Sequence, residues 1–267
     1  MKWPDLLSRP KPVPTHALPY GRLPQEVGDL WLPDRPGAPL VIMIHGGCWT
    51  KSIADRTIMN YVAEDLQRRG LAVWNIEYRG VDEAGGGYPG TYLDVAAGVD
   101  AARDLIRRYG LDPRPPVLIG HSAGGHLALW AAARARLPTA SPLRAKDPLP
   151  IKGVVDLAGL TDLEHDLKTA CGADPVLAMR GSAPGLSPYA DTSPIVLAPL
   201  GLPQVVLHGA EDVTVRPEIG VAYAERAVSR GDPVIVLTPP GGHVEEIAPE
   251  TPAWAAAAAA VLRLVSP

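Results

Sequence analysis

Short apolar runs that end in glycine-rich loops constrain the fold of this 267-residue chain more than any other feature. The runs 40–44, 116–119 and 204–208 are dominated by apolar side chains, which is typical of strands buried on both faces of a parallel sheet. Longer helical segments lie between them, from Thr57 to Arg69 and from Tyr92 to Tyr109. Strands that alternate with helices in this way predict a mostly parallel sheet with helices on both faces and right-handed crossovers.

The whole chain, residues 1–267, fits one α/β domain. Further strands are expected at 25–31, 71–78, 151–157 and 234–237, and further helices from Ser122 to about Arg134, at 218–230 and at 254–264. The proline-rich opening to about Pro39 can hold only short strands, and we expect it to pack on the sheet edge. The stretch from Thr161 to Pro194 has no clear periodicity. We interpret this stretch, 161–194, as a cap or lid over the carboxyl ends of the strands.

Composition argues against several classes of partner. Charged residues make up 20% of the chain and the net charge is −4, so neither a nucleic-acid nor a strongly charged partner is expected. Residues 1–20 contain no apolar run long enough for a signal peptide or a membrane span, which predicts a cytoplasmic protein without a membrane partner. Cys48 and Cys171 are far apart and form no metal-ligand pattern, so we expect no metal. An intracellular chain normally keeps its cysteines reduced, so we also expect no structural disulfide. A homodimer is left open.

The sequence Gly120-His121-Ser122-Ala123-Gly124 matches the pattern G-x-S-x-G. In this pattern a strained turn between a strand and a helix exposes the serine oxygen as a nucleophile. Glycines at both ends are expected because side chains there would keep the strand and the helix apart. An ordinary glycine-rich turn is the alternative, but the predicted strand before Ser122 and the predicted helix after it favour the catalytic interpretation.

A serine nucleophile needs a base, and that base needs an orienting acid. Of the seven histidines, His243 is favoured as the base because it follows the last predicted strand in a glycine-rich loop. Asp212 and its rival, the adjacent Glu211, both follow a strand as candidates for the acid, and only one of them can face His243. The chain order Ser122, Asp212, His243 is the one expected for this kind of hydrolase. We expect the remaining histidines, His16, His45, His126, His165 and His208, to have structural or surface roles.

Acyl transfer also requires donors for the oxyanion that develops in the transition state. The backbone N–H groups of Gly47, Cys48 and Ala123 are the candidates, since glycines in the loop after residue 44 let amides turn toward the substrate. Cys48 would act through its backbone alone. We expect Trp49 and His121 to contact the substrate, although Trp49 could equally belong to the core.

From roughly Leu40 to Ile247 the sequence resembles α/β-hydrolases of the branch that holds small carboxylesterases and serine-type kynurenine formamidases. His45-Gly46-Gly47-Cys48-Trp49 is similar to the H-G-G-x-W box of that branch, and residues 120–128 resemble its nucleophile turn. Asp212 matches the acid after the H-G-x-x-D stretch, and His243 matches the base. The resemblance implies the α/β-hydrolase fold and the triad Ser122, Asp212 and His243.

The expected function is hydrolysis of small carboxylic esters through an acyl-enzyme on Ser122, with no cofactor. The first alternative is an arylformamidase that cleaves N-formylkynurenine with the same triad, so that the small-molecule substrate is an ester or a formamide. A peptidase of the oligopeptidase type is disfavoured because the chain has no room for a gating domain. A binding protein with this fold but without catalysis is disfavoured because candidates for all three triad residues are present.

Overall fold

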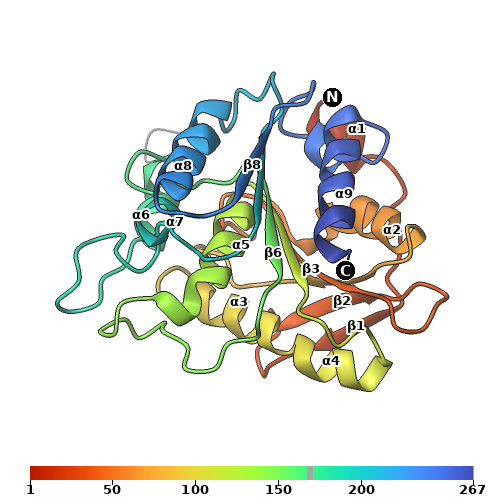
Figure 1. The fold of residues 1–267 in the computed structure, drawn as a ribbon, viewed down its shortest axis with the longest axis horizontal. Coiled ribbons are helices and arrows are strands. Elements are labelled where there is room, and N and C mark those ends of the chain that lie inside the picture. The colour runs from red at the N-terminus through yellow and green to blue at the C-terminus, as the bar shows by residue number, and fades with distance from the viewer. Residues whose placement is uncertain (167–170, 267) are drawn as a thin grey trace.

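The computed structural model describes residues 1–166 and 171–266, which contain an eight-stranded sheet (Figure 1). The strand order is β1-β2-β4-β3-β5-β6-β7-β8. In this order, β4, β3, β5, β6, β7 and β8 pair in parallel. At the other edge, β1 pairs antiparallel with β2, and β2 pairs antiparallel with β4. Their bounds are β1 (His16–Pro19), β2 (Val27–Trp31), β3 (Leu40–Ile44), β4 (Ala72–Ile76), β5 (Val117–His121), β6 (Gly153–Leu157), β7 (Gln204–Leu207) and β8 (Val234–Leu237).

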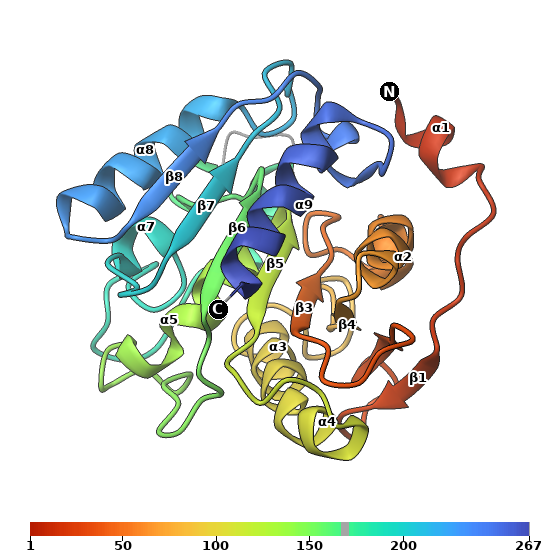
Figure 2. The ribbon, with the colours of Figure 1, turned by 45° about the vertical axis from the view of Figure 1, so that its right-hand side comes forward.

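Helices cover both faces of the sheet, as Figures 1 and 2 show. One side carries α1, α2 and α9, and the other carries α3, α5 and α8. The helices are α1 (Trp3–Leu7), α2 (Asn60–Arg68), α3 (Gly90–Asp100), α4 (Ala102–Tyr109), α5 (Ala123–Ala133), α6 (Ala173–Met179), α7 (Pro194–Leu197), α8 (Pro217–Ser229) and α9 (Pro252–Val265). Short 3₁₀ helices are η1 (Arg56–Met59), η2 (Arg134–Arg136) and η4 (Glu245–Ile247). Within the described residues, no helix is both long enough and apolar enough to span a bilayer.

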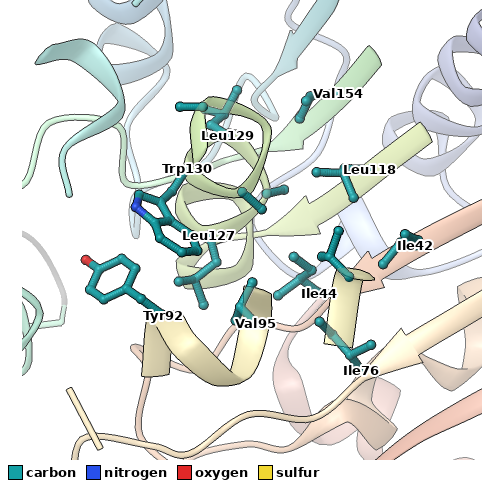
Figure 3. Close-up of a cluster of buried hydrophobic side chains, with 14 of the residues drawn as sticks. Ile42, Ile44, Ile76, Tyr92, Val95, Leu118, Leu127, Leu129, Trp130 and Val154 are labelled. Carbon is teal, nitrogen blue, oxygen red and sulfur yellow. The ribbon is translucent and has the colours of Figure 1, made fainter. Parts of the chain in front are cut away.

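The continuous apolar strands supply two separate cores. Side chains alternate along β3, so that Ile42 and Ile44 face the core around α3 and α5, while Val41 and Met43 face the core around α2 and α9. Figure 3 shows the first of these cores, with Trp130 of α5 among its larger side chains. Because both faces are covered, every residue of β3 is buried, as the sequence predicts for a central parallel strand.

The predicted mostly parallel α/β sheet is confirmed, and the expected strands and helices lie within a few residues of their predicted bounds. Three details differ. The helix predicted over 92–109 is two helices, α3 and α4, which meet at Ala101. The helix predicted from Thr57 begins as the 3₁₀ turn η1. The opening segment, expected to hold only strands, also contains the helix α1.

Candidate active site

Ser122 lies in a strained turn between β5 and α5. Its backbone has φ 56° and ψ −123°, a left-handed conformation that is unfavourable for a residue with a side chain. Its N–H donates to the carbonyl of Leu157 at 2.7 Å. A Cβ atom on Gly120 would lie 2.0 Å from the carbonyl oxygen of Gly124, and one on Gly124 would lie 2.1 Å from that of Ile44. The steric role predicted for both glycines is therefore confirmed.

His243 and Asp212 are joined across two loops at the carboxyl ends of the strands. The Nδ1 atom of His243 lies 2.7 Å from Oδ2 of Asp212, and both side chains are buried. The other carboxylate oxygen accepts from the N–H groups of Thr214 at 2.7 Å and Val215 at 3.0 Å. Burial raises the pKa of Asp212, but these hydrogen bonds and His243 outweigh it and hold the pKa below its usual value. Asp212 is therefore ionised at neutral pH and held in contact with His243.

Glu211 is the rival carboxylate for this role. It is exposed, and its side chain accepts a hydrogen bond from the N–H of Gly241. Of the two adjacent acids, the structure thus brings Asp212 and not Glu211 to His243.

The remaining histidines contact other parts of the molecule. Nδ1 of His126 accepts from the indole N–H of Trp49 at 3.1 Å, and its Nε2 lies 2.9 Å from the carbonyl of Thr192. His208 is buried, with Nδ1 3.4 Å from the carbonyl oxygen of Val215. Trp49 itself is 0% exposed in the core, which corrects the expectation that it contacts the substrate. His16 and His165 are exposed.

His121 supports the backbone of His243. Its Nε2 atom lies 2.9 Å from the carbonyl oxygen of His243, and the two ring centroids are 4.5 Å apart. Burial lowers the pKa of His121 well below its usual value, and the neighbouring His243 adds to the effect. A neutral imidazole in this position donates to the carbonyl and holds the loop of His243 in place.

Ser122 and His243 line one pocket of about 380 Å³ together with Gly47 and Cys48. Among the described residues, the N–H groups of Gly47, Cys48 and Ala123 donate to no protein acceptor. They are therefore free to donate to a substrate oxygen beside Ser122. Among the described residues, the Ser122 hydroxyl forms no hydrogen bond with His243. Hydrogen bonds of this kind often tighten only when substrate binds.

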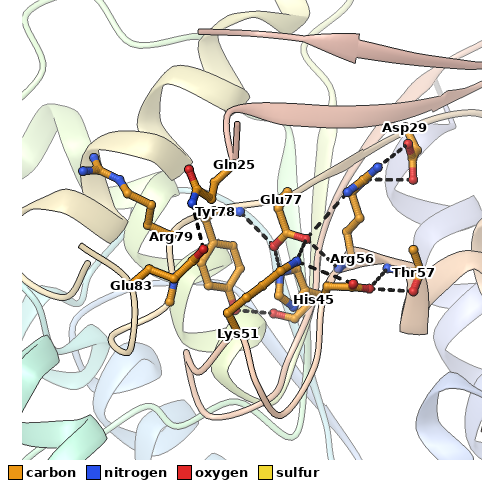
Figure 4. A network of polar contacts seen from close by, with 12 residues as sticks. Gln25, Asp29, His45, Lys51, Arg56, Thr57, Glu77, Tyr78, Arg79 and Glu83 are labelled. Carbon is orange, nitrogen blue, oxygen red and sulfur yellow. Dashed lines mark hydrogen bonds and ion pairs between the residues drawn. The ribbon is translucent and has the colours of Figure 1, made fainter. Parts of the chain in front are cut away.

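A buried network of charges stabilises the loop that carries Gly47 and Cys48 (Figure 4). Nε2 of His45 lies 2.7 Å from Glu77, whose other carboxylate oxygen accepts from Lys51 at 2.7 Å. Burial disfavours the Glu77 carboxylate, but His45 and Lys51 hold its pKa well below the usual value. Glu77 was not identified from the sequence as part of the site. The one signal for it in the sequence is an acidic residue at the end of an apolar strand.

The predicted cap, 161–194, packs against α3 and α5. The hydroxyl of Tyr92 donates to the carbonyl of Met179 at 2.8 Å, and the indole of Trp130 donates to that of Asp191 at 3.0 Å. None of its described residues lines the pocket of Ser122. Residues 167–170 of this segment lie outside the described residues.

Cys48 and Cys171 form a disulfide, with their Cα atoms 5.3 Å apart across a sequence separation of 123. The prediction of no structural disulfide is therefore wrong. It relied on sequence distance and on an intracellular location, whereas the fold places Cys171, just before α6, beside the loop that follows β3. The disulfide links the predicted cap to one of the candidate oxyanion donors.

Replacing Cys171 with serine is expected to lower the free energy of unfolding by about 2–5 kcal/mol, because the disulfide restricts a long loop of the unfolded chain. Urea denaturation of the oxidised wild type and the Cys171→Ser variant measures this difference. Reductant should bring the wild type to the stability of the variant and leave the variant unchanged. Equal stability of the two oxidised proteins would contradict the structural role of the disulfide.

The mostly parallel sheet, with Ser122 at a strand-to-helix turn and Asp212 and His243 in later loops, defines an α/β-hydrolase fold. Solved structures share it. Esterase B from Lactobacillus rhamnosis is 21% identical with a TM-score of 0.77, covering 96% of this chain and 87% of that one. A truncated carbohydrate esterase from gut microbiota is 21% identical with a TM-score of 0.76, covering 93% and 95%.

Residues 29–226 match the BD-FAE family model, and this chain belongs to the BD-FAE family. Two curated relatives from Mycobacterium tuberculosis are similar to it. Esterase LipC is 29% identical over 84% of this chain and 58% of its own length. The probable carboxylic ester hydrolase LipM is 30% identical over 74% of this chain and 47% of its own length. The chain thus spans about half the length of these relatives.

Proposed function

We propose that this protein hydrolyses carboxylic esters through an acyl-enzyme on Ser122. One observation carries the proposal: Ser122, at the tip of a strained turn, shares a pocket with His243, whose Nδ1 lies 2.7 Å from Asp212. A nucleophile, a base and an orienting acid in this relation are what acyl transfer requires. The relatives named as esterases support an ester substrate.

In the proposed mechanism, His243 Nε2 accepts the proton of Ser122 as its oxygen attacks the ester carbonyl carbon. The amides of Gly47, Cys48 and Ala123 donate to the resulting oxyanion. Preorganised donors lower the activation barrier most when they stabilise charge that develops in the transition state. Collapse of the intermediate releases the alcohol, which takes the proton from His243. A water molecule, deprotonated by His243, then attacks the acyl group. Collapse of this second intermediate releases the carboxylic acid, and His243 returns the proton to the oxygen of Ser122.

The test is a comparison of initial rates on 4-nitrophenyl acetate, butyrate and octanoate with the rate on N-formylkynurenine. The Ser122→Ala variant serves as the blank. Ester turnover that exceeds formamide turnover supports the proposal. Formamide cleavage that dominates would replace it with the arylformamidase alternative, and no turnover above the blank would favour a binding protein with this fold.

In this proposal residues 1–267 form one hydrolase domain, with 161–194 as its cap and a small-molecule ester as its substrate. It includes no nucleic-acid or membrane partner and no cofactor, and it leaves a homodimer open. The cytoplasmic location expected from the sequence stays a prediction. The disulfide between Cys48 and Cys171 weighs against it, because disulfides persist mainly in oxidising compartments.

A further inference from the structure

The segment that carries α1 is held firmly against the body of the protein. Leu6 is 0% exposed and belongs to the core that α2 and α9 share. Farther along, Asn60 donates to the carbonyl of Pro12 at 3.0 Å, and the hydroxyl of Tyr61 donates to that of Arg9 at 3.2 Å. Figure 2 shows this segment running past α2 on its way to β1. The position of α1 is therefore fixed by packing and by hydrogen bonds to α2.

One face of α1 closes the pocket of Ser122. Trp3 and Leu7 are four residues apart, so they share a face of the helix, and both line the pocket. The ring centroid of Trp3 lies 6.3 Å from that of His121 and 6.4 Å from that of His243, in edge-on geometry. Leu6, on the adjacent face, faces the core instead. An indole thus stands directly beside the proposed base.

A second part of the pocket wall is also apolar. It is formed by Ile53, Ala54 and Ile58, from the segment between β3 and α2. None of the described lining residues is lysine, arginine, aspartate or glutamate. A charged substituent would lose part of its hydration here without gaining an ionic partner, which is unfavourable. An apolar substituent would bury its surface against both walls.

From this arrangement we infer that Trp3 and Leu7 select the substrate: the pocket binds an uncharged, apolar substituent of the ester between α1 and the wall at Ile53 and Ile58. The inference rests on the proposed function and deepens it. The volume of about 380 Å³ falls in the range of small-molecule sites. Each methylene buried there should raise kcat/KM by about fourfold until the pocket is full.

The experiment measures kcat/KM on two series of esters. Two series are needed because the acyl group and the alcohol group are both attached to the carbon that Ser122 attacks, so that either group can enter the pocket. The acyl series is 4-nitrophenyl acetate, butyrate and hexanoate, and the alcohol series is methyl, butyl and hexyl acetate followed by pH-stat. A 4-nitrophenyl glutarate half-ester beside the pentanoate tests the charge. The variants are Trp3→Ala and Leu7→Ala, with Trp3→Phe as a conservative replacement. Val13→Ala, at an 83% exposed site outside the pocket, is the matched control.

For the wild type we expect kcat/KM to rise along one series. If that is the acyl series, kcat/KM should also be at least tenfold lower for the half-ester than for the pentanoate. Trp3→Ala should reduce that rise, with roughly tenfold loss on the longest member and less than about twofold on the shortest. Leu7→Ala should do the same more weakly, and Trp3→Phe should largely restore the rise.

Three results would overturn the inference. Rates that rise along neither series would show that the pocket takes no apolar group. If Trp3→Ala lowers kcat/KM equally on all substrates, or does not lower it, the indole has no role in selection. Ser122-dependent turnover would still support the proposed function in that case. Absence of ester turnover in the wild type would remove the proposed function, and the inference with it.

Discussion

Replacing Ser122 with alanine is expected to lower kcat for ester hydrolysis by about 10⁶-fold, the loss typical when a triad nucleophile is removed. The physical reason is that no covalent acyl-enzyme can form. The amides of Gly47, Cys48 and Ala123 would still polarise the ester, so a small residual rate above that of water is expected. Steady-state kinetics on 4-nitrophenyl butyrate measures the change.

The fold of the Ser122→Ala variant should be unaffected, because the Ser122 hydroxyl forms no hydrogen bond among the described residues and alanine fits the same turn. Thermal unfolding checks this point. The control is Ser229→Ala, which removes an exposed hydroxyl on α8 and should keep wild-type activity. A Ser122→Ala variant that retains wild-type kcat would exclude Ser122 as the nucleophile.

Replacing Asp212 with asparagine is expected to lower kcat by about 10⁴-fold. The carboxylate accepts from His243 and from the amides of Thr214 and Val215, so an amide group in its place would favour the wrong tautomer of the imidazole. It would also fail to stabilise the protonated form of His243. The same kinetic assay measures the loss.

Glu211→Gln is the matched control for Asp212→Asn, because it makes the same chemical change one residue away. Glu211 contacts the N–H of Gly241 and is exposed, so this variant should stay within about threefold of the wild type. A silent Asp212→Asn together with an inactive Glu211→Gln would show that the wrong carboxylate has been assigned.

The parts of the site that could be predicted are those with local signals. Ser122 lies in a motif whose glycines are required by contacts with the nearest strand and helix. His243 and Asp212 each follow a predicted strand, and parallel strands bring their carboxyl ends to one edge of the sheet. The order of strands and helices was therefore enough to bring Ser122, His243 and the neighbouring acids Glu211 and Asp212 to one edge of the sheet, and the family resemblance distinguished Asp212 from Glu211.

The parts that could not be predicted depend on contacts between distant segments. Trp3 lies in a proline-rich opening whose path across the molecule leaves no periodic pattern. The disulfide between Cys48 and Cys171 spans a separation of 123, and nothing near either cysteine indicates the other. Glu77 is an acidic residue in an apolar strand, and its partners, such as Lys51, are evident only once the loop after β3 is folded.

The central claim is that Ser122 is an activated nucleophile, and covalent labelling tests it most directly. The purified wild type is incubated with a fluorophosphonate, its intact mass is measured, and the labelled peptide is sequenced by mass spectrometry. We predict one phosphonyl group per chain, attached to Ser122 and absent from the Ser122→Ala variant. A protein that takes up no label, or a label on another residue that persists in Ser122→Ala, would contradict the claim.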